Sequence, residues 1–375
     1  MSKSEITLAI LIDYSKAFDT IDYGIPLEKL YGLKFSHDSI QILSSYLCGR
    51  SQFIQIDDQV SSDLPMFFGV PQGSILGPVL FNLYVIELSD RISSNAIQYA
   101  DDTTIYRHCK ITDTTDCIKE IEKDLEQLLS WSKNHNLLFN SDKLQFIVFA
   151  SQQLSRKLTD RSFLIRCSGI SVEQKNNVKL LGIVFDQALI WNEQVNRMIK
   201  SSYGTLRALR KFGRFTPFYV RKSLAEALII SKLNYCNSVF GQMPKYLFCR
   251  LQKVQNITAG YVLSRYANIE DVINLKWLPV KELCQWNTVK LVHRSKCDPK
   301  YPTYLQVEFH EPRRSLRSSD KEPIVAAGEA KTFQEQAREY DKLPEKIRKI
   351  EQLQKFSKES KMFYLDSALA DILKA

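Results

Sequence analysis

Residues 99–102, with the sequence Tyr-Ala-Asp-Asp, constrain the fold of this chain more than any other segment. They lie between two short runs, residues 96–98 and 103–106, that alternate in polarity and contain β-branched residues. Such runs on both sides of a short acidic segment predict a tight β-hairpin with adjacent carboxylates at its turn. Two carboxylates held in this way suit a divalent cation, although aspartate is also common in ordinary turns.

A second carboxylate is expected at the end of an earlier strand. The apolar, β-branched run Ile6–Ile12 is long enough to be a buried strand, and Asp13 follows it directly. If this strand neighbours the hairpin, Asp13, Asp101 and Asp102 could together bind two Mg²⁺ ions, as phosphoryl-transfer chemistry requires. Without metal, three crowded carboxylates would repel one another and their pKa values would rise.

Three ordered motifs connect this chain to a known family. They are residues 11–22 (Leu-Ile-Asp-Tyr-Ser-Lys-Ala-Phe-Asp-Thr-Ile-Asp), residues 69–78 (Gly-Val-Pro-Gln-Gly-Ser-Ile-Leu-Gly-Pro) and residues 99–102. Together they resemble the reverse transcriptases of non-LTR retrotransposons of the LINE type, in particular the Jockey-like ones. The resemblance extends through residues 137–149 and 180–182, and more loosely along the remainder. It implies an RNA-directed DNA polymerase that joins a dNTP to the 3′-hydroxyl of a DNA primer on an RNA template.

The resemblance assigns roles to individual residues. It implies that Mg²⁺, for which Mn²⁺ could substitute, is bound by Asp13, Asp101 and Asp102. Lys143 matches a lysine near the leaving pyrophosphate, and Phe18 matches an aromatic gate that excludes a ribose 2′-hydroxyl. The residues expected to contact the incoming nucleotide or the template are Gln72, Gly73 and Tyr99. The residues alone also allow simpler roles, because Phe18 could pack in the core and Lys143 could be an ordinary solvated lysine.

A basic segment follows the last predicted strands. Residues 197–222 contain eight lysines and arginines and no acid, and five aromatic residues lie among them. A merely solvated helix would usually carry compensating acids, so this segment is predicted to bind nucleic-acid phosphates. The side chains expected to do so are Arg197, Lys200, Arg207, Arg210, Lys211 and Arg214.

These patterns predict an α+β fold. Residues 1–190 are expected to form a right-hand polymerase palm with the ferredoxin-like order β-α-β-β-α-β. Residues 191–270 would form a helical thumb, and residues 271–375 a helical C-terminal tail. Within the palm, residues 163–167 and 178–185 are expected to be the last pair of strands, and the second of these resembles the family's primer grip. The basic cluster Arg313, Arg314 and Arg317 is expected in a loop of the tail.

The chain also departs from the family. Asp13 lies about a dozen residues from the start, so most of the fingers subdomain that precedes this position in the family is expected to be missing. Either the chain is part of a longer reading frame or it is a degenerate copy. A catalytically inactive nucleic-acid-binding remnant is therefore the main alternative to an active polymerase. A metal-dependent nuclease is the least favoured of the three functions, because the sequence lacks a His or Glu at the spacing expected of a general base.

Composition is consistent with these expectations without deciding between them. The net charge of +9 favours a polyanionic partner. The eight cysteines include no C-x-x-C pair. His293 and Cys297 are four residues apart with Cys284 upstream, but a zinc site needs a fourth ligand that the sequence does not offer, so such a site is not favoured.

No signal peptide is evident, and the first predicted strand is too short to span a bilayer. We therefore expect an intracellular protein without a membrane partner, and the sequence leaves its oligomeric state open.

Overall fold

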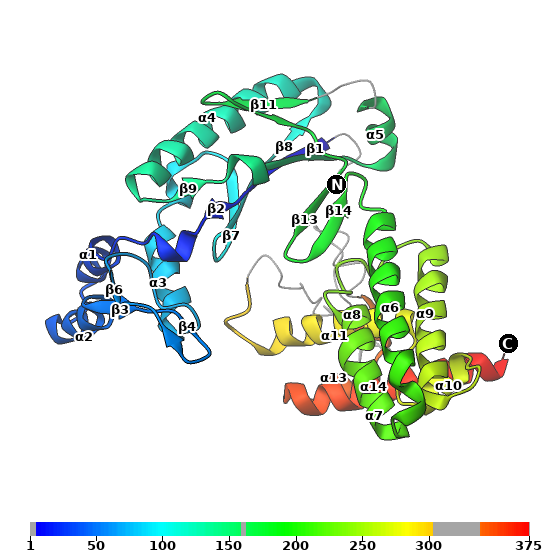
Figure 1. Ribbon diagram of the computed structural model, residues 1–375. Coiled ribbons are helices and arrows are strands. Elements are labelled where there is room, and N and C mark those ends of the chain that lie inside the picture. The colour runs from blue at the N-terminus through cyan, green and yellow to red at the C-terminus, as the bar shows by residue number, and fades with distance from the viewer. Residues whose placement is uncertain (1–4, 159–162, 303–337, 375) are drawn as a thin grey trace. The chain divides into compact units, whose positions relative to one another are not determined.

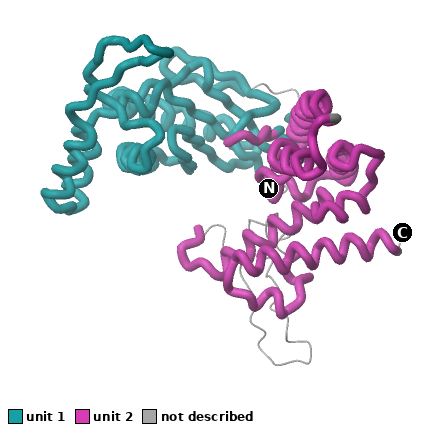
Figure 2. The backbone as a smooth tube through the Cα atoms, turned by 60° about the horizontal axis from the view of Figure 1, so that its bottom comes forward, with its two compact units in different colours: residues 1–180, 186–189 teal, residues 181–185, 190–375 magenta. Residues whose placement is uncertain are grey.

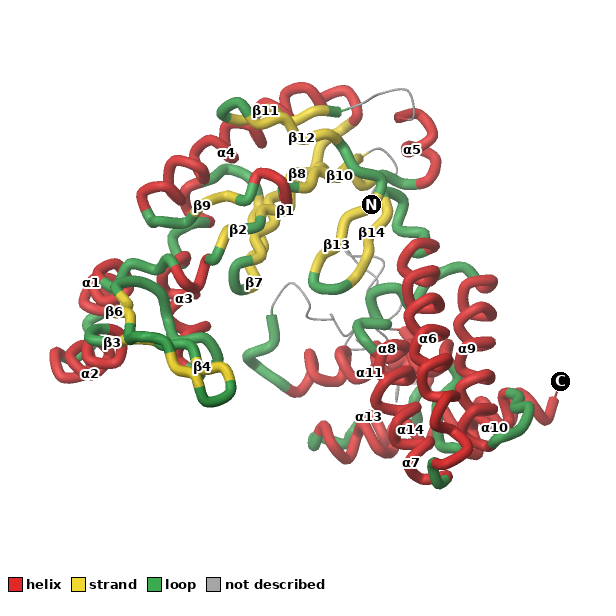
Figure 3. Tube along the Cα trace, in the orientation of Figure 1, coloured by secondary structure: helices red, strands yellow, loops and turns green. Residues whose placement is uncertain are grey.

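The computed structural model describes residues 5–158, 163–302 and 338–374. The chain divides into two compact units (Figure 2), the first comprising residues 1–180 and 186–189 and the second residues 181–185 and 190–375. The first unit combines strands and helices, whereas the second is almost entirely helical (Figure 3). The predicted mixed α+β character is confirmed.

A four-stranded sheet forms the centre of the first unit (Figure 1). Its strand order is β10-β1-β8-β7, and each neighbouring pair is antiparallel. Along the chain, α3 lies between β1 and β7, and α4 lies between β8 and β10, which is the predicted order β-α-β-β-α-β. The bounds of these elements are β1 (Glu5–Ile12), α3 (Leu76–Val85), β7 (Asn95–Tyr99), β8 (Asp102–Lys110), α4 (Thr114–Asn134) and β10 (Gln145–Phe149).

The position of β1 inside the sheet explains its apolar sequence. β1 pairs with β8 on one side and β10 on the other, and its residues from Leu8 onwards are buried. A strand that is covered on both faces reads as a continuous apolar run, as residues 6–12 do. Ile121, Leu125 and Leu128 recur at helical spacing on α4 and join the same core.

The segment between β1 and α3 contains two helices and small antiparallel strand pairs. α1 packs against both α2 and α3. Strand β2 pairs with the distant β9, so that Tyr14 lies opposite Phe139. The elements outside the main sheet are β2 (Tyr14–Ser15), α1 (Gly24–Gly32), α2 (His37–Leu47), β3 (Arg50–Gln52), β4 (Gln55–Ile56), β5 (Gln59–Val60), β6 (Leu64–Met66), β9 (Leu138–Phe139) and α5 (Gln152–Leu158).

The predicted pairing of the last strands is wrong. β11 (Leu164–Cys167) pairs with β12 (Ile170–Glu173), and residues 178–185 are two strands rather than one. These are β13 (Asn177–Leu180) and β14 (Ile183–Asp186), which form a two-stranded sheet. The chain turns between them at Leu181 and Gly182, which have φ values of +46° and +84°. Two successive positive φ values are typical of the two-residue turn that joins hairpin strands.

The second unit consists of helices. α6 packs against α9, and α11 packs against α14. A π-helical turn at residues 226–230 separates α7 from α8, and there the Glu226 carboxylate accepts a hydrogen bond from the Trp277 indole at 2.7 Å. The helices are α6 (Asn192–Phe212), α7 (Phe218–Ala225), α8 (Ser231–Asn234), α9 (Lys245–Leu263), α10 (Ile269–Asn274), α11 (Val280–Cys297), α13 (Glu345–Arg348) and α14 (Leu353–Lys374).

His293 belongs to the packing of α11 on α14. Its ring is fully buried and stacks on Phe356, with 3.6 Å between the ring centroids. Its Nδ1 lies 3.1 Å from the Tyr340 hydroxyl, and its Nε2 lies 3.6 Å from Cys297 Sγ. Burial lowers the pKa of His293 to about 4. The ring is therefore a neutral part of the core at pH 7.

Candidate active site

The register of β1 and β8 brings two of the predicted metal ligands to the same sheet edge. The last paired residues are Ile12 and Thr103. One step further along the same antiparallel register, Asp13 falls opposite Asp102. Side chains at opposite positions in such a pair have their Cβ atoms about 5 Å apart. The structure thus places Asp13 beside Asp102, although 88 residues lie between them in the sequence.

The β7–β8 hairpin carries the third carboxylate. Tyr99 pairs with Asp102, so only Ala100 and Asp101 form the turn, as the sequence predicted. Ala100 has a φ of +53°, a conformation that costs free energy for a residue with a side chain. Tyr99 ends β7 with its side chain exposed. The tight turn therefore holds Asp101 and Asp102 next to each other at the edge where β1 ends.

A separate segment places Lys143 at the same edge. The Asn140 backbone amide donates to the Asp13 carbonyl oxygen at 2.9 Å, directly after the β2–β9 pairing. A short 3₁₀ turn, Ser141–Lys143, then directs the Lys143 ammonium to the Asp13 carboxylate, at 3.1 Å from Nζ to Oδ2. Pairing of β2 with β9 thus connects the position of Lys143 to that of Asp13.

The electrostatics of Asp102 reflect this gathering of acids. Burial raises the pKa of Asp102, and the charges of Asp101 and Asp13 raise it further, whereas Lys143 lowers it. The three carboxylates therefore interact, and their mutual repulsion is only partly compensated by one lysine. A cation bound at this edge would remove the rest of that repulsion.

The donor set fits Mg²⁺ chemically. Carboxylate oxygens are the ligands that Mg²⁺ prefers in proteins. Within the described residues, no group of three or more His, Cys, Asp or Glu side chains is arranged to hold a metal ion. In this arrangement the Asp13 carboxylate faces Lys143 instead. Asp13, Asp101 and Asp102 would need side-chain rotation to share a cation.

The segment that begins at Gly69 is held against the chain that follows β2. The Gly69 amide donates to the Ile21 carbonyl and the Val70 amide to the Phe18 carbonyl, at 2.8 and 2.9 Å. Gly69 has a φ of +83°, and a Cβ atom there would lie 2.8 Å from the Asp19 backbone. Only glycine allows this close approach.

The close approach of Gly69 to the Asp19 backbone positions the Gln72 side chain. Its side-chain amide is exposed and donates to the Asp19 carboxylate at 2.8 Å, while Gly73, with a φ of +83°, leaves space beside it. Ser74 then accepts a hydrogen bond from the Gly77 amide at the start of α3. The loop therefore combines an oriented side-chain amide with a helix start that is stabilised by the Ser74 hydroxyl.

Phe18 has a fixed ring position. It is half-buried and stacks on Phe81, with 4.6 Å between the ring centroids. Phe81 is fully buried in the core of the first unit. Both interpretations of Phe18 are compatible with this placement, because one face packs and part of the ring stays accessible.

Two supporting residues were not predicted. Arg50 donates to the Leu47 carbonyl and the Tyr23 hydroxyl, at 2.8 and 2.7 Å, and also to the Gly69 carbonyl. The Asp19 carboxylate accepts a hydrogen bond from the Gln72 side-chain amide. Neither contact has a sequence signal, because each joins positions that only the folded chain brings together.

Comparisons with known proteins identify the family of the first part of the chain. The family described as "Reverse transcriptase (RNA-dependent DNA polymerase)" matches residues 1–185. Residues 1–185 form a reverse transcriptase domain. The chain is related to the RNA-directed DNA polymerase from mobile element jockey of Drosophila melanogaster, at 26% identity over 212 residues. The probable polymerase from transposon BS of the same species is 26% identical over 214 residues.

These similarities cover part of each protein. The jockey match spans 53% of this chain and 22% of the jockey protein, and the BS match spans 54% and 22%. Among solved structures, apo telomerase from Candida tropicalis aligns with a TM-score of 0.36 at 12% identity, over 74% of this chain and 45% of that one. The same telomerase with a TWJ fragment of telomeric RNA gives 0.35 at 10% identity, over 76% and 47%. TM-scores this low do not establish a shared fold.

Beyond the reverse transcriptase domain, α6 has one basic face and one buried face. At about 100° per residue, its exposed cations fall within roughly 140° of the helix circumference. They are Arg197, Lys200, Arg207, Arg210 and Lys211. Val195, Met198 and Leu206 are buried on the other side. The side chain of Arg214, also predicted to bind phosphates, lies outside the described residues.

Two further basic residues have internal partners. The Arg221 guanidinium donates to the Val262, Gly213 and Thr216 carbonyls, at 3.0, 3.4 and 3.3 Å. Lys222 lies 3.8 Å from the Glu226 carboxylate. Arg221 therefore stabilises the helix ends of the second unit.

Two remaining expectations concern other parts of the chain. The cluster Arg313, Arg314 and Arg317 lies outside the described residues. In the part of the chain that the structure describes, no helix is long and apolar enough to span a membrane.

Proposed function

We propose that this chain is an RNA-directed DNA polymerase that extends a DNA primer on an RNA template, with its palm in residues 1–190. The observation that carries the proposal is the register of β1 and β8, which puts Asp13 beside Asp102, next to Asp101 in the β7–β8 turn. Membership of residues 1–185 in the reverse transcriptase family supports the same reaction. Asp13, Asp101 and Asp102 would hold two Mg²⁺ ions, or Mn²⁺ in their place. Bound there, Mg²⁺ supplies activation of the primer 3′-hydroxyl and stabilisation of the charge that develops on the leaving pyrophosphate.

The protein's own groups would orient the reactants. Lys143, whose ammonium lies 3.1 Å from the Asp13 carboxylate, would donate a proton to the leaving pyrophosphate. Gln72, oriented by Asp19, would contact the nucleotide or the templating base, with Gly73 allowing close approach of the backbone and Tyr99 at the hairpin end. Phe18, fixed by stacking on Phe81, would exclude a ribose 2′-hydroxyl.

In this proposal the second unit binds nucleic acid. Residues 191–270 would act as a thumb. The exposed face of α6 supplies cations, and the sequence from residue 197 to the end of α6 at residue 212 contains no acid. Each cation that contacts a phosphate releases a counterion, so affinity falls with salt and does not depend on sequence. Residues 271–375 would be the C-terminal tail.

A second candidate is a nucleic-acid-binding protein without polymerase activity. It is favoured by the ion pair of Lys143 with Asp13, which engages one expected metal ligand. The cations of α6 could bind template and primer whether or not chemistry follows.

Primer extension distinguishes the two candidates. The full chain is incubated with an RNA template, a DNA primer, dNTPs and Mg²⁺, and compared with the double variant Asp101→Asn/Asp102→Asn. An active polymerase should extend the primer, and the double variant should lose activity by about a thousandfold while it still binds template and primer. Asp142→Asn, which removes an exposed acid beside Lys143, is the matched control. Salt-dependent binding without any extension by the wild type would instead favour the inactive protein.

A further inference from the structure

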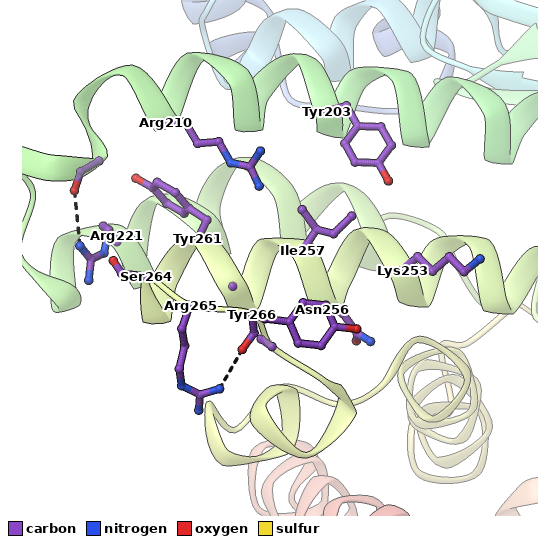
Figure 4. Close-up of a pocket in the computed structure, with 13 residues that line it drawn as sticks. Tyr203, Arg210, Arg221, Lys253, Asn256, Ile257, Tyr261, Ser264, Arg265 and Tyr266 are labelled. Carbon is purple, nitrogen blue, oxygen red and sulfur yellow. Dashed lines mark hydrogen bonds between the residues drawn. The ribbon is translucent and has the colours of Figure 1, made fainter.

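A groove lies between α6 and α9 in the second unit (Figure 4). Its volume is about 750 Å³. Arg210 and Tyr203 extend from α6 towards α9, while Tyr261 and Ile257 extend from α9 towards α6. The groove is therefore built from two packed helices that share one core, and its lining belongs to a single unit.

The groove combines aromatic rings with unopposed positive charge. Tyr266 is 90% exposed and Tyr203 is 42% exposed, so their ring faces are accessible. No acid is found among the described residues that line the groove. Arg265 forms an ion pair with Asp271 outside it. For Arg210 and Lys253 the structure shows no ion pair within the described residues, so both charges are available to an anion.

One buried polar atom in the groove has no partner. The Tyr261 side chain lines the groove, is 7% exposed, and its hydroxyl oxygen makes no hydrogen bond within the described residues. A buried hydroxyl normally has a hydrogen-bond partner, because leaving it without one costs free energy. A ligand that enters the groove could provide that partner.

We infer that this groove binds unpaired nucleotides of a single-stranded nucleic acid, with bases stacked on Tyr266 and Tyr203 and phosphates bound by Arg210 and Lys253. Basic grooves with accessible aromatic rings are the common means of binding single strands without sequence preference. A duplex does not fit this description, because its bases already stack on one another and expose no faces along its length. The inference rests on the proposed nucleic-acid binding of the second unit and does not depend on catalysis.

The test is equilibrium binding of the full chain to labelled probes in the presence of EDTA. The probes are an oligouridylate of about eight nucleotides, the matching oligothymidylate, and a blunt RNA–DNA duplex of the same length. Tyr266→Ala should weaken binding of the single strands about tenfold and leave binding of the duplex within about twofold. Tyr219→Ala, which removes an exposed tyrosine of α7 outside the groove, is the matched control and should change neither.

A second pair of variants tests the charge and the unpartnered hydroxyl. Arg210→Gln should weaken single-strand binding more than Arg207→Gln, which removes an exposed cation of α6 that does not line the groove. Tyr261→Phe should weaken it about fivefold without lowering the Tm, because the lost hydroxyl has no partner in the free protein.

Three outcomes would overturn the inference. In the first, Tyr266→Ala and Tyr219→Ala weaken single-strand binding equally. In the second, Tyr266→Ala weakens binding of the duplex as much as binding of the single strands. In the third, Tyr261→Phe binds single strands with the affinity of the wild type. Failure of the proposed polymerase would look different, because it would abolish primer extension and leave single-strand binding in EDTA intact.

Discussion

At the scale of single residues, the acidic sheet edge is a site where function and stability oppose each other. The β1–β8 register forces Asp13 and Asp102 together, and the turn adds Asp101. Only Lys143 is close enough to Asp13 to form an ion pair within the described residues. Such a concentration of like charge is expected where a cation is to be bound, and it lowers the stability of the metal-free protein.

This argument predicts that Asp102→Asn stabilises the metal-free protein. The pKa of Asp102 is raised in the folded state, so its contribution favours folding below the ordinary pKa and is lost as pH rises through the raised value. Asparagine resembles the protonated form, and at pH 7 in EDTA the Tm should rise by about 2 °C. Mg²⁺ should raise the Tm of the wild type but not that of the variant. A lower Tm for Asp102→Asn in EDTA would contradict this account, and Asp142→Asn serves as the control.

At the scale of elements, the close contact of Gly69 with the chain at Asp19 positions Gln72. Two glycines of the first unit have nearly the same backbone conformation, Gly69 with a φ of +83° and Gly169 with +82°. A Cβ atom at Gly69 would meet the Asp19 backbone at 2.8 Å, whereas at Gly169 it would meet nothing within 4 Å. The pair separates the effect of steric contact from that of backbone conformation.

We therefore expect Gly69→Ala to destabilise the protein by about 3 kcal/mol and Gly169→Ala by about 1 kcal/mol, measured by urea denaturation. Both variants incur the cost of a positive φ, but only Gly69→Ala forces two backbone segments apart. Equal losses would show that the Gly69–Asp19 contact is loose. Primer extension by Gly69→Ala should fall as well, because Gln72 would move with the loop.

The packing of α11 on α14 gives a prediction for pH. His293 has a pKa of about 4 in the folded protein and is expected near 6.5 in the unfolded chain. The unfolded chain therefore binds a proton more tightly, and stability falls as pH decreases from about 6.5 towards 4. Between pH 7 and pH 5 the loss should be about 1–2 kcal/mol in the wild type. In His293→Gln this part of the pH dependence should disappear, and a variant with the wild-type pH dependence would refute the assignment.

The sequence predicted elements better than their contacts. The acidic segment at residues 99–102 identified the hairpin turn because its flanking runs alternate. The apolar residues of α4 also recur at helical spacing in the sequence. The turn at Leu181 and Gly182 was missed because it interrupts an apolar run, although a glycine inside a strand pattern is itself a signal of a turn or bulge. The contact of Gln72 with Asp19 could not be predicted, because it depends on tertiary packing between segments 53 residues apart.

At the scale of the whole molecule, the two units carry different chemistry. The first has the acidic edge and the reverse transcriptase match, and the second has the basic face of α6 and the groove beside α9. The net charge of +9 describes their sum and conceals this division. Variants in the second unit should therefore weaken nucleic-acid binding, whereas variants at the acidic edge of the first unit should slow nucleotide transfer.

The central claim is that Asp13 acts together with the Asp101–Asp102 turn in nucleotide transfer. The most direct test is the single-turnover rate of adding one dNTP to a primer bound on an RNA template, with Mg²⁺, for Asp13→Asn and for Asp142→Asn. We predict that Asp13→Asn lowers this rate by about a thousandfold at unchanged template–primer affinity, while Asp142→Asn stays within about threefold of the wild type. An Asp13→Asn variant that adds the nucleotide at the wild-type rate would contradict the account.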